Sequence, residues 1–253
     1  MFMMQDSEEQ GGAVNPAPPG GRIPVIDVLR GLCVVLMATF HFSYDLYFYC
    51  AFPPIVIDNF FMTFCQVFSS WGFILLAGLS SRLSRSNIKR GVVVLCGGAA
   101  VSVVSYLWGD FIRFGILQFL GCAMVIYGLS RALWERVPRR FAPFLYLGLF
   151  IIAIRMLPIT LEVPYLYPFG FITPTFRSAD YFPLFPWFFW FLLGTWLGEF
   201  VKEGRLSEKS GKIKVRPLAF LGRHSFAVYF IHQPVLVAVS AILALLTGHK
   251  LPF

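Results

Sequence analysis

The chain has 253 residues, of which 57% are hydrophobic and 13% are charged, with a mean hydropathy of +0.71 and a formal net charge of +8. This composition is more apolar and less charged than that of a soluble domain, so it excludes a soluble fold and indicates an integral membrane protein. The positive charge does not indicate nucleic-acid binding, because the basic residues lie in short segments between apolar spans. We therefore expect an all-α, polytopic membrane helix bundle.

The N-terminal segment, residues 1–21, is rich in Gly and Pro and has no basic region that leads into an apolar core, so we do not expect it to be a cleavable signal peptide. We expect it to be a disordered cytoplasmic tail. A single transmembrane domain is expected to follow over residues 22–253.

The first apolar span, residues 22–49, carries two aspartates, an arginine and a histidine inside it although it is hydrophobic enough to cross a bilayer. At about 100° per residue these side chains fall within about a 60° arc of one helix; they are Asp27, Arg30, His41 and Asp45. Lipid offers neither hydrogen bonds nor counter-charges, so this polar stripe must face protein or a water-filled cavity. The span therefore predicts one wall of a functional site.

His41 and Asp45 are four residues apart and can reach the same face. A carboxylate beside an imidazole is typical of a general base, although a buried histidine is often only structural. Arg30 lies about 16 Å nearer the cytoplasmic end, where a guanidinium can bind a phosphate. The alternative role of Arg30 is an ion pair with Asp27.

Further apolar runs long enough to cross a membrane predict about seven helices in all; they lie at about 60–80, 91–108, 114–130, 141–157, 185–201 and 218–247. Basic residues follow the second, fourth and sixth spans, which places the N-terminus in the cytoplasm and the C-terminus outside. Arg82, after the second span, is either one of these orienting charges or a second phosphate ligand. Closely spaced glycines such as Gly194 and Gly198 predict tight helix packing.

The last run is longer than one crossing needs and contains Pro234, so we expect a kinked or broken helix. His232 is a second histidine at membrane depth, either functional or bonded to a backbone carbonyl that Pro234 frees. Asp180 lies in the aromatic outer loop of residues 158–183, which is either part of the interfacial belt or a re-entrant cover over an outer cavity. The five cysteines match no metal or disulfide spacing.

Several segments resemble the bacterial relatives of the heparan-α-glucosaminide N-acetyltransferase catalytic domain, within the transmembrane acyltransferase superfamily. The most specific are IDVLRGLCVVLMATFHFSYDL, ADYFPLFPW and GRHSFAVYFIHQPVL, supported by FILLAGLSSR and RFGILQFLG. The resemblance implies that an acyl group passes from cytoplasmic acyl-CoA to a glycan or other envelope acceptor across the bacterial plasma membrane, and that Arg30 and His41 take part. The outer segment CAFPPIVIDNFF lacks the histidine of the heparan-modifying branch, so activity on glucosamine is not supported.

We therefore predict a membrane-embedded acyltransferase that uses acyl-CoA, with acetyl-CoA as the expected donor and no metal. Arg30 and Arg82 would bind the CoA phosphates, and His41 with Asp45 would deprotonate the acceptor or handle the acyl group. Further candidates for the site are Asp27, Asp180 and His232.

The competing prediction is a small transporter or channel, in which the polar stripe conducts protons or positions a solute. Against it, the sequence shows no inverted repeat and concentrates charge in one helix. An inactive membrane scaffold is a third alternative. The sequence leaves open the acceptor and whether the protein forms a homodimer.

Overall fold

The computed structural model describes residues 23–157, 159–203 and 215–248, so the tail predicted to be disordered lies outside the described residues. The helices are α1 (Pro24–Phe48), α2 (Phe60–Leu83), α3 (Asn87–Trp108), α4 (Ile116–Trp134), α5 (Ala142–Met156), α6 (Leu184–Lys202), α8 (Arg216–Arg223) and α9 (Ser225–Leu246). Two 3-10 turns, η1 (Pro54–Val56) and η2 (Tyr167–Phe169), and two short strands, β1 (Ile159–Thr160) and β2 (Phe171–Ile172), lie in the connections.

Six of the described helices are long and apolar enough to cross a membrane: α1, α2, α3, α4, α6 and α9. α5 is apolar but has only 15 residues, which corresponds to about 22 Å, less than the hydrocarbon core of about 30 Å. The predicted all-α, polytopic bundle is confirmed, and the protein is an integral membrane protein. The fifth predicted span corresponds to α5, which is apolar like the other six but shorter.

The predicted break in the last apolar run is present, but it lies at His224 and not at Pro234. α8 ends immediately before His224, and α9 begins immediately after it and continues through Pro234. The break lets α8 pack on α1 at very close range: a Cβ on Gly31 would lie 1.9 Å from the carbonyl oxygen of Leu218, and a Cβ on Gly222 only 1.8 Å from that of Asp27. Larger residues at these two glycines would force the helices apart.

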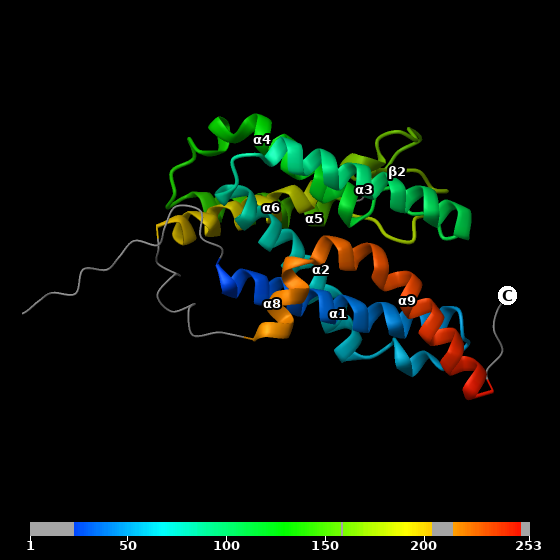
Figure 1. Ribbon diagram of the computed structural model, residues 1–253. Coiled ribbons are helices and arrows are strands. Elements are labelled where there is room, and N and C mark those ends of the chain that lie inside the picture. Colours follow the sequence, from blue (N-terminus) through cyan, green and yellow to red (C-terminus); the bar gives the residue numbers. More distant parts are fainter. Residues whose placement is uncertain (1–22, 158, 204–214, 249–253) are drawn as a thin grey trace, which may run out of the picture.

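The helices form two layers with α2 between them (Figure 1). One layer holds α3, α4, α5 and α6, and the other holds α1, α8 and α9. α2 packs against both α1 and α6. Glycines permit the second of these contacts, because a Cβ on Gly78 would lie 2.0 Å from the Phe191 carbonyl oxygen and one on Gly194 2.1 Å from that of Leu75. The packing role predicted for the glycines is confirmed here.

The densest core lies in the layer of α4 and α6. Phe119, Phe191 and Leu192 have no exposed surface, and Tyr127 is 1% exposed. Trp71 on α2 extends this core through ring contacts with Phe150, Trp187 and Trp190. This layer is therefore a densely packed, apolar surface that faces the polar side chains of α1 and α9.

The outer loop after α5 is tied to the connection between α3 and α4. The amide of Ala179 donates to the carbonyl of Phe111, and that of Phe182 donates to the carbonyl of Phe114. The Asp180 carboxylate accepts a hydrogen bond from the backbone N–H of Ile116, at the start of α4. These contacts hold the end of the loop over the space between the layers.

Candidate functional site

A cavity of about 640 Å³ lies between the two layers and is lined by α1, α2, α3, α4, α8, α9 and the end of the outer loop. Its walls are largely apolar, with polar side chains at intervals along its length. The ionisable ones are Arg30, Arg90, Arg223, His41, His232, Tyr44, Tyr49, Tyr229, Asp110 and Asp180. A concave, mostly apolar space with a few convergent polar groups is typical of a ligand site.

Three arginines, Arg30, Arg90 and Arg223, line one part of the cavity, which we call the arginine end. Arg30 donates to the hydroxyl of Ser80 and lies 3.4 Å from a carboxylate oxygen of Asp27. The ion pair considered from the sequence is therefore formed. Arg90 is close enough to Arg30 for their charges to interact. Within the described ranges, neither Arg90 nor Arg223 has a carboxylate within ion-pair distance.

His41 on α1 and His232 on α9 meet in the middle of the cavity, with ring centroids 5.1 Å apart and rings nearly perpendicular. Nδ1 of His41 lies 2.9 Å from the Met37 carbonyl oxygen, and Nδ1 of His232 lies 2.7 Å from that of Tyr229. Since a carbonyl can only accept, each Nδ1 carries the proton and each neutral ring keeps Nε2 as its basic nitrogen. Nε2 of His232 is buried and has no partner among the described residues. Both histidines thus present a basic nitrogen at membrane depth.

The predicted hydrogen-bonded pair of His41 and Asp45 is not formed. Side chains on a helix point toward its N-terminus, so His41 reaches back to the Met37 carbonyl and away from Asp45. The fully buried Asp45 accepts a hydrogen bond of 2.7 Å from Nε2 of Gln233, the residue after His232. Asp45 Oδ2 and Gln233 Oε1 lack partners among the described residues. Asp45 is therefore connected to the histidines through α9.

Arg82 does not line the cavity. It contacts the carboxylates of Glu135 and Glu199, and its side chain is 15% exposed. These contacts belong to an ion-pair network that joins the ends of α2, α4 and α6, with members Arg82, Arg131, Arg139, Glu135, Glu199 and Glu203. The structure thus places Arg82 apart from Arg30, in a group whose charges already have partners.

Acidic groups lie at the other end of the cavity. The hydroxyl of Tyr49, just after α1, donates to the carboxylate of Asp110, just after α3. Asp180 also lines this end. Burial raises the pKa of Asp180 to about 6, although the N–H of Ile116 favours its charged form. The cavity thus runs from an arginine end, past two histidines, to an acidic end.

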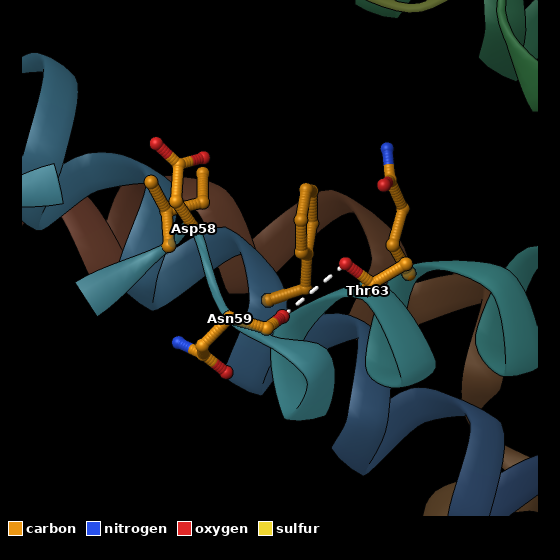
Figure 2. A pocket seen from close by; sticks show the side chains of 6 residues that line it. Asp58, Asn59 and Thr63 are labelled. Carbon is orange, nitrogen blue, oxygen red and sulfur yellow. Dashed lines mark hydrogen bonds between the residues drawn. The ribbon is translucent and has the colours of Figure 1, made fainter. Parts of the chain in front are cut away.

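A second hollow of about 430 Å³ lies beside the cavity, where the chain enters α2 (Figure 2). It is lined by Phe40, Ile57, Asp58, Asn59, Thr63 and Gln66. Phe40 and Gln66 also line the large cavity, so the two spaces share a wall.

Sequence reasoning missed this hollow, together with Arg90, Arg223 and Gln233. Arg90 and Arg223 look like the other basic residues between spans, and only their place in the fold distinguishes them. The hollow did have a signal, because Thr63, Gln66 and Ser70 recur at helical spacing within an apolar span. Among the described residues, no group of three or more His, Cys, Asp or Glu side chains is placed to hold a metal ion.

Comparison with known protein families gives a match over most of the chain. The family model described as heparan-alpha-glucosaminide N-acetyltransferase, catalytic, matches residues 22–234. No curated protein and no solved structure matches the chain. The matched range includes all of the ionisable cavity residues named above.

Proposed function

The chain belongs to the heparan-α-glucosaminide N-acetyltransferase catalytic-domain family, and from this premise we propose that it transfers an acyl group from acyl-CoA to an acceptor inside the cavity. Acetyl-CoA is the proposed donor. The observation that carries the proposal is the order of groups along the cavity, from three arginines to two histidines to an acidic end. The family is one of membrane acetyltransferases, whereas the donor, the acceptor and the residue roles are our proposal.

The arginine end suits the phosphates of CoA. Guanidinium groups bind phosphates through two parallel hydrogen bonds, and Arg90 and Arg223 have no competing carboxylate among the described residues. Arg30 lies eleven residues before His41 on α1, a rise of about 16 Å. A ligand that reaches both residues must be long, flexible and anionic at one end. Acyl-CoA has that form, with its thioester at the far end of the pantetheine arm.

His41 is the proposed general base. Its Nε2 takes the proton of an acceptor hydroxyl or amine, whose oxygen or nitrogen attacks the thioester carbonyl carbon. The carbon–sulfur bond breaks, the acyl group stays on the acceptor, and the CoA thiolate leaves and takes the proton from His41. His232 offers a second basic nitrogen beside it. Asp45 is a positioning residue in this proposal, because it fixes Gln233 next to His232.

We propose that the arginine end faces the cytoplasm and that the acceptor, an extracytoplasmic glycan or other envelope molecule, comes from the opposite side of a bacterial plasma membrane. This orientation rests on the basic segments that follow α2, α4 and α6. Single-cysteine labelling in intact cells, in a background without the natural cysteines, tests it. Thr173→Cys should react with an impermeant reagent, and Val137→Cys should react only after lysis. Strong labelling of Val137→Cys in intact cells would reverse the orientation.

The direct test of the function is turnover of labelled acetyl-CoA by the protein purified in detergent. His41→Ala should slow acetyl transfer at least about 100-fold, a typical contribution of a general base, while the Kd for CoA stays within about twofold of wild type. His224→Ala is the matched control, because Nδ1 of His224 also contacts a backbone carbonyl, that of Phe220, but His224 does not line the cavity.

Unimpaired turnover in a folded His41→Ala protein would remove His41 from the chemistry. If wild type neither binds CoA nor releases it from acetyl-CoA, the acyltransferase proposal fails, and the cavity becomes a candidate solute pathway.

A further inference from the structure

A polar face of α2 runs from the outer hollow into the main cavity. Thr63 and Gln66 line the hollow, and Gln66, Ser69 and Ser70 line the cavity. Residues three and four apart lie on one face of a helix, so these side chains form a continuous strip. Polar side chains are uncommon in a membrane span, and here they gather on the face that borders the two spaces. The strip marks a polar route between the hollow and the cavity.

Two side chains that border the hollow, those of Asp58 and Gln66, make no hydrogen bond with the rest of the described chain. Asn59 is used in the fold, because its side-chain oxygen caps α2 at the N–H of Met62 and its amide donates to the Ile55 carbonyl. Thr63 donates to the Asn59 backbone, and Figure 2 shows Asp58 and Thr63 on either side of the space. The Asp58 carboxylate borders the hollow and can accept hydrogen bonds. The Gln66 amide also borders it and can both donate and accept them.

The hollow also has an apolar surface in the right place. Phe40 lines both spaces and precedes His41, with the two ring centroids 5.8 Å apart. A ligand that rests against Phe40 is thus next to the proposed base. A carboxylate, an amide and hydroxyl groups around an aromatic ring can bind the hydroxyls of a sugar-like ring while its C–H face packs on the aromatic. The charge of Asp58 disfavours an anionic ligand.

We propose that this hollow is the acceptor subsite and that it binds a neutral, hydroxyl-rich acceptor. The proposal rests on the acyltransferase function proposed above. One acceptor hydroxyl, directed past Phe40, loses its proton to His41 as its oxygen attacks the thioester carbonyl carbon. The carbon–sulfur bond breaks, an ester forms on the acceptor, and CoA leaves as the thiol with the proton from His41.

The test uses n-octyl β-D-glucoside as the acceptor probe, below its critical micelle concentration, with the full chain in lipid nanodiscs and labelled acetyl-CoA. Wild type should form octyl acetylglucoside with a saturable KM for the glucoside. Asp58→Asn and Gln66→Leu should each raise that KM about tenfold, the effect of one lost hydrogen bond of about 1.4 kcal/mol. The Kd for CoA should stay at the wild-type value in both variants. Glu162→Gln, which removes an outer-loop carboxylate that does not line the hollow, is the control and should leave the KM unchanged.

The possible outcomes distinguish a failure of the acceptor-subsite proposal from a failure of the acyltransferase proposal. If wild type binds CoA and hydrolyses acetyl-CoA through His41 but does not acetylate octyl glucoside, the hydroxyl-rich acceptor is wrong and the acyltransferase proposal stands. Acetylation of n-octylamine alone would likewise overturn it. An unchanged KM in both variants would place the acceptor outside the hollow. If acetyl-CoA is neither bound nor turned over, the function itself fails, and the acceptor subsite fails with it.

Discussion

Two groups of arginines lie at the same end of the protein and differ in their partners. In the ion-pair network, Arg82, Arg131 and Arg139 each contact a glutamate. At the arginine end of the cavity, the described residues form one ion pair, between Asp27 and Arg30. Arg30 also bonds Ser80, two residues before Arg82, so both groups occupy the same level of α2.

The difference separates the charges that link helices from the charges that we propose as phosphate ligands. A guanidinium that already contacts a carboxylate is less available to an anionic ligand than one without such a partner, and among the described residues Arg90 and Arg223 have none. The network therefore links helices, and we propose the arginine end as the site for phosphates.

Removing the arginine end gives the largest expected effect. The double variant Arg30→Ala with Arg90→Ala should weaken CoA binding at least about 100-fold, because each hydrogen bond between charged groups contributes about 1.5–3 kcal/mol. Calorimetry on the solubilised protein measures this Kd.

Single variants at Arg30 show what its guanidinium group contributes to CoA binding. Arg30→Lys should recover only part of the affinity lost in Arg30→Ala, because an ammonium lacks the planar two-point contact of a guanidinium. Wild-type affinity in the folded double variant would show that CoA phosphates bind elsewhere.

Breaking the network should give the opposite pattern. Arg82→Ala leaves Glu135 and Glu199 without one partner each, so the melting temperature should fall by several degrees, the effect of about 1–3 kcal/mol. The Kd for CoA should stay within about twofold of wild type. A large loss of CoA affinity at unchanged melting temperature would return Arg82 to the phosphate site.

The smallest expected effect concerns Asp180 at the acidic end, whose carboxylate accepts a backbone hydrogen bond and forms no ion pair with any described residue. Burial raises its pKa to about 6, above the usual value of about 4 for an aspartate, so the folded protein favours the protonated carboxyl. The resulting stability is fully present below about pH 4 and is lost as the pH rises through about 6. Between pH 5 and pH 7 the melting temperature of wild type should therefore fall more than that of Asp180→Asn. Parallel curves for the two proteins would show that Asp180 titrates normally.

The elements of the fold were predictable because each span is a long apolar run and glycines mark the close contacts. The His41 and Arg30 face was predictable from helical spacing. The sequence predicts a break near Pro234, because a proline is visible there. The actual break at His224 depends on the packing of Gly222 on α1, which the sequence does not show.

Partner choice was the part that the sequence could not provide. Helical spacing puts Asp45 on the same face as His41. The two side chains point in different directions, however, so Asp45 bonds Gln233 and His41 bonds the backbone carbonyl of Met37. Arg82 and Arg90 are both basic residues near span ends, and the sequence does not show that glutamates lie beside Arg82 and not beside Arg90. Such pairings depend on helices that are far apart in the chain.

The most direct test of the account is a cryo-electron microscopy structure of the full chain in nanodiscs with acetyl-CoA bound. We expect the CoA phosphates within ion-pair distance of Arg30, Arg90 and Arg223, with the thioester beside Nε2 of His41. Phosphate density on Arg82 or Arg139, or a thioester outside the cavity and away from His41, would contradict this expectation.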